Sequence, residues 1–206
     1  MRDEQQQADL AQDDADPAAR SATRPASRRG VLVLITGPMF AGKSSALIAQ
    51  ARAHGTDALV LKPAFDTRGG ATVIASRDRS RADALPVVAW PEEACTRPVL
   101  VIDEAQFLVP PHYRGDIVAD IARAVADGAC ITVGGLDTDY HRRPFAVIAR
   151  LSALADRHLH LQARCHVCGE PARWTAKKTE TGRLLEPGDD DLYEARCDAH
   201  WSEPGG

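Results

Sequence analysis

The stretch VLVLITGPMFAGKS, residues 31–44, decides the fold. Its first half, VLVLIT (31–36), is an unbroken run of mainly branched apolar residues, which is typical of a parallel strand buried on both faces. Its second half, GPMFAGKS (37–44), matches the pattern G-x-x-x-x-G-K-[ST]. The segment SSALIAQARAHG (44–55) then has a helical pattern that ends at a glycine. This order predicts a phosphate-binding loop between a buried strand and a helix.

The spacing within the loop has a physical reason. Gly37 and Gly42 allow the backbone to turn tightly, so that several N–H groups point inward at a phosphate, and the helix adds the positive end of its dipole. Lys43 can reach the β and γ phosphates of ATP, and the Ser44 hydroxyl can hold Mg²⁺. The alternative is a chance glycine turn. The predicted nucleotide-binding residues are Gly37, Pro38, Met39, Phe40, Ala41, Gly42, Lys43, Ser44 and Asp103.

Two carboxylates follow a second buried run in VLVIDEAQF (99–107). An Asp after an apolar strand is the usual second Mg²⁺-organising group of a phosphate-loop enzyme, so we expect Asp103 to act on the metal through water. Glu104 can accept a proton from an attacking hydroxyl or from water. That role does not by itself separate a kinase from an ATPase, and the alternative is that both acids only cap the sheet edge.

The remaining apolar patterns alternate between strands and helices. Strands are predicted at 57–62, 71–76, 85–90, 99–104 and 130–136, helices at 114–128 and 145–155, and the strands of a C-terminal ribbon at 174–178 and 184–186. This alternation predicts an α/β fold, with a phosphate-loop parallel sheet flanked by helices. After Arg164, cysteine, glycine and polar residues take over, which indicates a small C-terminal zinc-ribbon-like β lobe.

These changes in composition divide the chain into four parts. Residues 1–29 contain no aromatic residue and are rich in Ala, Arg, Asp, Gln and Pro, so we expect a disordered N-terminal tail. Residues 30–163 are predicted to form the nucleotide-binding α/β domain, residues 164–201 a zinc-binding lobe, and residues 202–206 a short tail.

Two cysteine knuckles lie in the C-terminal lobe, CHVC (165–168) and CDAH (197–200). Their candidate ligands are Cys165, Cys168, Cys197 and His200. Three thiolates and one imidazole make a closed tetrahedral set, which predicts a structural Zn²⁺ site rather than a catalytic one. The alternative is two reduced pairs with no metal. Cys95 and Cys130 lie outside this pattern, and we expect them to be small core residues.

The overall composition argues against several classes of protein. Of the 206 residues, 44% are hydrophobic and 26% are charged, and the net charge of -4 gives no electrostatic footprint for nucleic acid or an anionic membrane. The sequence has no run of about 18 apolar residues, so we expect no transmembrane helix. The first residues lack the apolar region of a signal peptide, and five cysteines are too few for a disulfide scaffold. A cytoplasmic protein with reduced thiols is the expectation.

Five segments together resemble the type II thymidine kinases, the family of the human cytosolic and bacterial enzymes. They are GPMFAGKS (37–44), LKPAFDTR (61–68), DEAQF (103–107), GLDTDYHRRPF (135–145) and the C-terminal cysteine module. In that family the fourth segment is a lasso loop that closes over the nucleoside base, and the module is a zinc-bound lobe. The matches follow the family's order and cover roughly residues 30–201.

The resemblance implies a role for each candidate residue in the phosphorylation of thymidine by ATP. Glu104 is implied as the general base on the 5′-hydroxyl, Arg68 as the cation that stabilises the transferring phosphoryl group, and Asp66 as a neighbour of the metal and the hydroxyl. The implied walls of the base pocket are Met39, Phe107, Leu136, Tyr140 and Phe145, with Tyr193 contacting the nucleoside from a loop of the zinc lobe and Thr175 nearby. Without the resemblance, a surface ion pair explains Arg68 equally well, and the core explains the aromatic residues better.

The resemblance also implies a homotetramer and feedback inhibition by thymidine triphosphate. Two other functions stay open: a phosphate-loop ATPase whose zinc knuckle binds nucleic acid or protein, and a kinase that prefers deoxyuridine or another pyrimidine nucleoside. An ATPase does not need the lasso or the Lys-x-x-x-Asp-x-Arg pattern of residues 62–68, and the acidic charge disfavours nucleic acid. Deoxyuridine differs from thymidine by one methyl group, worth only about 1–3 kcal/mol. The sequence departs from the family pattern at Ala41, Arg77 and Tyr140.

Overall fold

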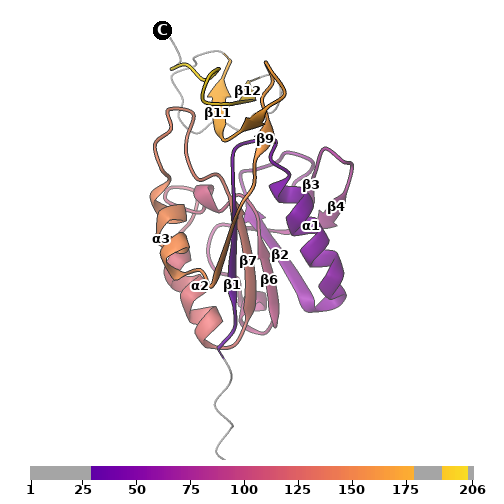
Figure 1. Cartoon of the computed structure of the whole chain (residues 1–206). Helices are drawn as coiled ribbons and strands as arrows, with labels where there is room; N and C mark the ends of the chain where they lie inside the picture. The colour runs from indigo at the N-terminus through magenta and orange to yellow at the C-terminus, as the bar shows by residue number, and fades with distance from the viewer. Residues whose placement is uncertain (1–28, 179–191, 204–206) are drawn as a thin grey trace, which may run out of the picture.

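The central sheet is built around β1 (Leu32–Thr36), the buried strand that precedes the phosphate loop. In the computed structural model, which describes residues 29–178 and 192–203, six parallel strands lie in the order β5-β2-β6-β7-β1-β8 (Figure 1). The other five are β2 (Ala58–Pro63), β5 (Leu85–Val87), β6 (Val99–Ile102), β7 (Cys130–Gly135) and β8 (Arg157–His160). The predicted parallel α/β sheet is confirmed.

Helices cover both faces of this sheet (Figure 1). One face carries α1 (Lys43–His54) and a hairpin of β3 (Val73–Ala75) and β4 (Arg81–Asp83), and the other carries α2 (Ile117–Ala126) and α3 (Ala146–Leu154). Short 3₁₀ helices are η1 (Gly55–Asp57), η2 (Glu92–Cys95) and η3 (Ala105–Phe107). Side chains alternate across β1, so Leu32 and Leu34 pack with α2 and α3, whereas Ile35 packs with α1. The strand is therefore buried on both faces, as its apolar run predicts.

The inner face of α2 supplies a test of this packing. Ile121 is 0% exposed between the helix and the sheet. We expect Ile121→Ala to lower the free energy of unfolding by about 2–5 kcal/mol and Ile121→Val by about 0.5–1.5 kcal/mol, because each removes buried methyl groups. Denaturant unfolding measures both values, with Arg123→Ala on the exposed face of the same helix as the control. Equal losses for Ile121→Ala and Arg123→Ala would contradict the observed core.

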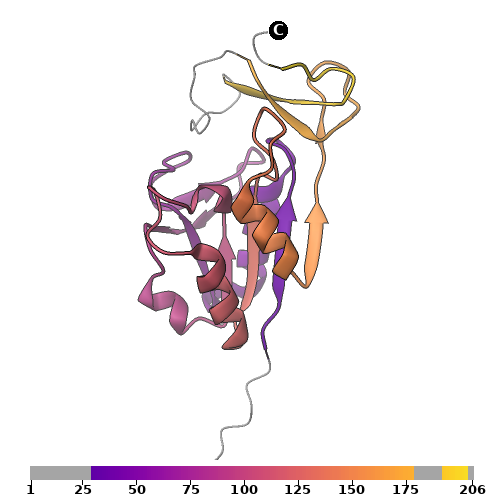
Figure 2. The same cartoon turned by 90° about the vertical axis from the view of Figure 1, so that its left-hand side faces the viewer.

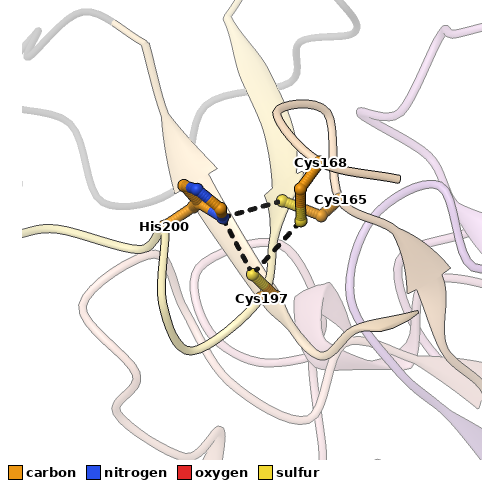
Figure 3. A group of neighbouring side chains, drawn as sticks. All are labelled: Cys165, Cys168, Cys197 and His200. Carbon is orange, nitrogen blue, oxygen red and sulfur yellow. Dashed lines mark hydrogen bonds between the residues drawn. The ribbon is translucent and has the colours of Figure 1, made fainter. Parts of the chain in front are cut away.

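The C-terminal lobe lies over the carboxyl ends of the strands (Figures 1 and 2). It consists of two antiparallel pairs, β9 (Ala163–Arg164) with β10 (Pro171–Ala172), and β11 (Trp174–Lys177) with β12 (Tyr193–Arg196). Its candidate ligands Cys165, Cys168, Cys197 and His200 converge at one point (Figure 3). The phosphate loop packs against the lobe through Phe40 and Ala41, which contact its small apolar core. The lobe therefore covers the carboxyl-terminal edge of the sheet, where functional residues are expected.

The edge strand β8 has no apolar pattern in the sequence and is not predicted. All four of its residues are exposed. It joins the sheet through backbone pairing with β1, and its His158 and His160 rings approach the Thr36 hydroxyl at 2.8 and 3.2 Å. The strand conformation of β8 therefore depends on its backbone pairing with β1 and not on an apolar pattern of its own.

Two predictions about single cysteines are wrong. Cys95 and Cys130 are both exposed rather than buried. Cys95 lies at the end of the surface turn η2, and Cys130 is the first residue of β7, away from the packed middle of that strand. The predicted strand at 184–186 and residues 1–28 of the predicted tail fall outside the described residues. Within the described part of the chain, no helix has the length and apolar character needed to cross a membrane.

Candidate active site

A cavity of about 520 Å³ opens where the carboxyl ends of β1, β2, β6 and β7 meet the C-terminal lobe. Most of the residues predicted from the sequence line it: Met39, Phe40, Gly42, Lys43, Ser44, Asp66, Arg68, Asp103, Glu104, Phe107, Leu136, Tyr140, Phe145, Thr175 and Tyr193. The other loop residues, Gly37, Pro38 and Ala41, lie in the same turn without lining the cavity. Parallel strands end at one edge of a sheet, which is why segments far apart in the sequence meet here.

The phosphate loop has the backbone geometry that its glycines predict. Gly37 and Gly42 have φ values of 143° and 85°, which side-chain-bearing residues rarely adopt. Lys43 is buried, and its Nζ donates to the carbonyl oxygens of Gly37 at 3.0 Å and Pro38 at 2.7 Å. Burial lowers the pKa of Lys43, against the opposing attraction of Glu104 and the other nearby carboxylates. The ammonium group of Lys43 therefore has little access to water, so its attraction to a phosphate would be strong.

Ser44 and Asp103 bring a hydroxyl oxygen and a carboxylate together beside the loop. The Ser44 hydroxyl donates to Asp103 Oδ2 at 3.1 Å, and the Asp103 side chain is buried. Burial, reinforced by the charge of Glu104, raises the pKa of Asp103 to about 7. A cation next to Asp103 would favour its ionised form, and hydroxyl and carboxylate oxygens are the ligands that Mg²⁺ prefers. The residues therefore fit a magnesium site.

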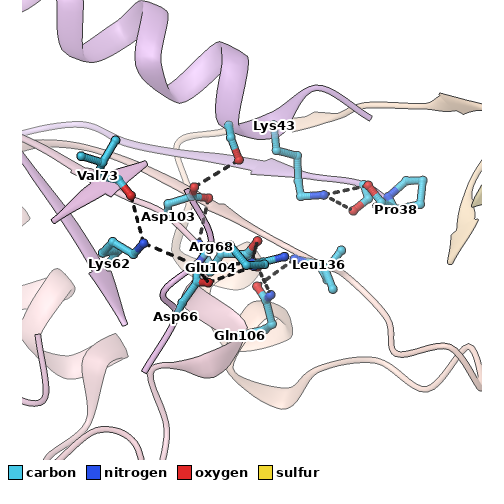
Figure 4. Close-up of polar contacts among 12 residues, drawn as sticks. Pro38, Lys43, Lys62, Asp66, Arg68, Val73, Asp103, Glu104, Gln106 and Leu136 are labelled. Atoms are coloured by element: carbon cyan, nitrogen blue, oxygen red, sulfur yellow. Dashed lines mark hydrogen bonds and ion pairs between the residues drawn. The ribbon is translucent and has the colours of Figure 1, made fainter. Parts of the chain in front are cut away.

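Glu104 and Asp66 share one arginine (Figure 4). Arg68 donates through Nη2 to Glu104 Oε1 at 2.5 Å and through Nε to Asp66 Oδ1 at 2.9 Å. The charge of Glu104 and the bonds to Asp66 raise the pKa of Arg68, although its partial burial opposes this. Burial alone would raise the pKa of Asp66, but its bonds to Arg68 outweigh that effect and lower it. A permanent cation is thus held between two carboxylates at the cavity wall.

Two buried polar side chains support this network, and the sequence did not single them out as site residues. Lys62 is 1% exposed, and its Nζ donates to the carbonyl oxygens of Gly70 at 3.1 Å and Val73 at 3.0 Å and lies 3.8 Å from Asp66 Oδ2. It braces the loop after β2 that carries Asp66. Its only signal in the sequence is its place at the start of the Lys-x-x-x-Asp-x-Arg pattern.

Gln106 is the second of these side chains. It is 1% exposed, its Nε2 donates to Glu104 Oε2, and its Oε1 accepts from the Leu136 N–H at 3.0 Å. One amide therefore connects the carboxylate of Glu104 to the start of the loop after β7. Glu104 itself has φ 53°, an uncommon conformation for this residue type, so its side chain is aimed by a fixed backbone as well as by Gln106.

The resemblance implies that Glu104 is the general base of thymidine phosphorylation, so removing the Gln106 amide is expected to slow that reaction. We expect Gln106→Leu to lower kcat about 10- to 100-fold, because a small displacement of a reacting group can cost about 10²-fold. Steady-state kinetics with thymidine and ATP measure the change. Gln50→Leu, the same substitution at an exposed position on α1, is the control. Equal kcat values for the two variants would rule out a positioning role for Gln106.

The aromatic and apolar candidates also line the cavity. Phe107, Tyr140 and Tyr193 are each at most 7% exposed and come from η3, the 136–145 loop and β12. Thr175 joins the lobe to the phosphate loop, because its Oγ1 accepts from the Met39 N–H at 3.0 Å. The structure therefore brings the predicted pocket residues of both parts of the chain into one chamber.

The Cys/His cluster lies beside this chamber, in the lobe. The ligand atoms of Cys165, Cys168, Cys197 and His200 all lie within 4.8 Å of one another (Figure 3). Burial opposes ionisation of Cys165, but N–H groups of Cys168, Cys197 and Val167 hydrogen-bond to its sulfur and lower its pKa to about 6. A thiolate is the form that binds metal. The donor set and its geometry therefore fit a four-coordinate Zn²⁺ ion.

Comparison with known proteins agrees with this geometry. Residues 30–201 match the family model described as thymidine kinase. The chain is 33% identical over 193 residues to the thymidine kinase of Pyrobaculum aerophilum, covering 84% of this chain and 100% of that protein. It is 35% identical over 178 residues to the thymidine kinase of Mesomycoplasma hyopneumoniae, covering 82% of this chain and 94% of that protein.

Among solved structures, a Pif1 helicase from Bacteroides, in complex with ADP-AlF3 and ssDNA, is similar with a TM-score of 0.32 and 18% identity over 52% of this chain and 29% of that chain. That likeness is too slight to inform function. The match to the family model and the two curated relatives each extend over most of the chain. The chain belongs to the thymidine kinase family.

Proposed function

We propose that this chain is an ATP-dependent thymidine kinase. It transfers the γ-phosphoryl group of ATP to the 5′-hydroxyl of thymidine and yields ADP and thymidine 5′-monophosphate. The observation that carries the proposal is a single cavity lined at once by the phosphate loop and by Glu104 and Arg68. A phosphate donor and a hydroxyl acceptor bound in this cavity would meet next to both side chains, and phosphoryl transfer is mostly a matter of such positioning.

The donor end of the cavity binds the ATP phosphates. The N–H groups of residues 40–44 surround the β phosphate, and Lys43 exchanges its bonds to the carbonyl oxygens of Gly37 and Pro38 for bonds to the phosphate oxygens. Ser44 and Asp103 hold Mg²⁺, which neutralises charge on the phosphates when it is bound. These contacts fix the γ phosphorus facing the acceptor.

At the acceptor end, Glu104 accepts the proton of the 5′-hydroxyl as the new O–P bond forms and the bond to the β-phosphate oxygen of ADP breaks. Arg68 offers its guanidinium to the oxygens of the transferring phosphoryl group. Asp66 holds Arg68 in place through two hydrogen bonds, at 2.9 and 3.3 Å, and lies close to the acceptor hydroxyl. In this reaction Glu104 takes up the proton, and ADP is the leaving group.

The base of thymidine occupies the chamber between Met39, Phe107, Leu136, Tyr140 and Phe145, with Thr175 and Tyr193 contributed by the lobe. Apolar and aromatic walls suit a flat pyrimidine ring with a methyl group. The Cys/His cluster binds a structural Zn²⁺ and holds the strands that carry Thr175 and Tyr193 in register. Tyr140, where the sequence departs from the family pattern, adds a hydroxyl group to this wall.

Three further properties follow from membership of the family and are part of the proposal. The chain assembles as a homotetramer, is inhibited by thymidine triphosphate, and acts in the cytoplasm. Sedimentation of the purified protein tests the first, because a species four times the mass of the 22.2 kDa chain is expected. Titration of the reaction with thymidine triphosphate tests the second.

The decisive experiment measures transfer of labelled phosphate from ATP with Mg²⁺ to each common deoxynucleoside, with a sample that lacks nucleoside as the control. Labelled thymidine monophosphate as the main product is the expected result. Loss of ATP that is independent of any nucleoside would contradict the proposal and indicate an ATPase. A preference for deoxyuridine, which lacks the methyl group of thymidine, would change the assigned substrate but not the type of reaction.

A further inference from the structure

A cation that contacts the faces of two tryptophan rings joins the wall of the cavity to the C-terminal lobe. The wall segment is the 136–145 loop, which connects β7 to α3 and reaches the underside of the lobe (Figure 2). The Arg142 guanidinium carbon lies 3.7 Å from the ring centroid of Trp201 and 4.3 Å from that of Trp174. An arginine stacked on an aromatic face is attracted by the ring quadrupole, and here two rings act on one guanidinium.

Both rings belong to the lobe and lie next to its metal-binding residues. Trp174 opens β11, and Trp201 directly follows the candidate ligand His200. The Trp174 indole donates from Nε1 to Asp198 Oδ1 at 2.8 Å, and Asp198 directly follows the candidate ligand Cys197. The rings are therefore held by the same short segment that carries the second cysteine knuckle.

Arg142 has an uncommon backbone conformation, which other contacts must stabilise. Its φ of 63° is in the left-handed region, where residues with a side chain such as arginine are uncommon. Its Nε is buried and has no hydrogen-bond partner among the described residues. Contacts with the rings must therefore offset part of the cost of this conformation.

Arg142 directly continues the part of the loop that faces the cavity. Asp139 and Tyr140, which lie three and two residues before Arg142, both line the cavity. Asp139 Oδ1 accepts from the N–H groups of His141 at 2.8 Å and Arg143 at 2.9 Å, so the residues around Arg142 form one compact turn. Within that turn, a movement of Arg142 would be transmitted to the Tyr140 side chain.

We propose that Arg142 is a positioning residue for the nucleoside: through its contacts with the Trp174 and Trp201 rings, which we call the clamp, it holds the 136–145 loop in the conformation that completes the thymidine pocket. The inference rests on the proposed function, since it names how that pocket is kept formed. If the pocket is complete in only a fraction of the molecules, the apparent dissociation constant for the ligand equals the intrinsic constant divided by that fraction. Loss of the clamp should therefore act on thymidine binding and not on the chemical step.

The test compares Arg142→Asn with Arg143→Asn. Asparagine tolerates the left-handed backbone and removes the cation, and Arg143 is the exposed neighbour, so the matched control loses the same charge. We expect Arg142→Asn to raise KM for thymidine about 10-fold, with kcat changed by less than about 2-fold and KM for ATP unchanged. Trp201→Leu should give a similar rise, and Trp201→Phe a smaller one, because a phenyl ring retains part of the attraction.

A second readout is independent of activity. Amide hydrogen exchange across residues 136–143 should be faster in Arg142→Asn than in Arg143→Asn or in the unmodified chain. Unchanged exchange together with an unchanged KM would overturn the clamp, as would a loss of kcat with no change in KM. If the unmodified chain fails to phosphorylate thymidine, the proposed function fails, and hydrogen exchange then decides on its own whether the clamp holds the loop.

Discussion

Replacing Glu104 with Gln is expected to lower kcat for thymidine phosphorylation by about 10³-fold, within the range of about 10²–10⁴ that a general base contributes. Glutamine keeps the size of the side chain but cannot take up the proton of the 5′-hydroxyl. KM for ATP should stay close to its original value, because the proposed phosphate contacts come from the 37–44 loop and Lys43, which the substitution leaves in place. Steady-state rates with saturating thymidine and ATP measure the effect.

The loss of charge has a second consequence that the experiment must separate. Without the Glu104 carboxylate, Arg68 keeps its bonds to Asp66 and loses its ion pair at 2.5 Å. Glu104→Asp retains the charge but withdraws the carboxylate by one methylene, so an intermediate kcat is expected. Glu92→Gln, at an exposed position on η2, is the control. If Glu104→Gln retained more than about a tenth of kcat, proton transfer to Glu104 would not be part of the reaction.

The sequence is enough to predict that the candidate phosphate-binding and acidic residues meet, because they directly follow buried strands. Ser44 and Asp103 stand 59 positions apart but meet at 3.1 Å, since β1 and β6 end at the same edge of one parallel sheet. The alternation of apolar strands and helices is enough to predict that edge. The same reasoning does not find β8, whose exposed residues carry no pattern.

Contacts that depend on three-dimensional packing are beyond sequence patterns. Lys62 is a polar residue in an otherwise apolar strand, and Gln106 closely follows two acidic residues; only the fold shows that each is buried with partners. In the sequence Arg142 is one of several arginines, and only the fold brings the Trp174 and Trp201 rings into contact with it. The pattern Cys-x-x-Cys, in contrast, predicts its geometry locally, because both sulfurs lie within one turn of chain. No such pattern surrounds Cys95 and Cys130, and their predicted burial was wrong.

Removing one ligand of the Cys/His cluster should have the largest effect outside the catalytic residues. The purified chain is expected to contain about one equivalent of zinc, and Cys197→Ser to contain almost none, because a four-ligand site loses its closed tetrahedral set. Cys197 directly follows β12, which carries Tyr193, and β12 pairs with β11, which carries Thr175. Loss of the metal should therefore release two residues of the thymidine pocket and both rings around Arg142.

We expect kcat/KM for thymidine to fall by about 10²-fold or more in Cys197→Ser, since the free energy of zinc binding is also the folding free energy of a small metal lobe. Elemental analysis measures zinc, and far-ultraviolet circular dichroism confirms that the α/β domain persists. Cys130→Ser is the matched control, because that thiol is exposed and lies outside the cluster, so zinc and activity should both be retained. A chelator should reproduce the loss in the unmodified chain, and added zinc should reverse it. Full thymidine kinase activity in a zinc-free protein would show that the lobe holds its residues in place without metal, through the strand pairs and the small apolar core of Ala163, Ala172 and Ala195 alone.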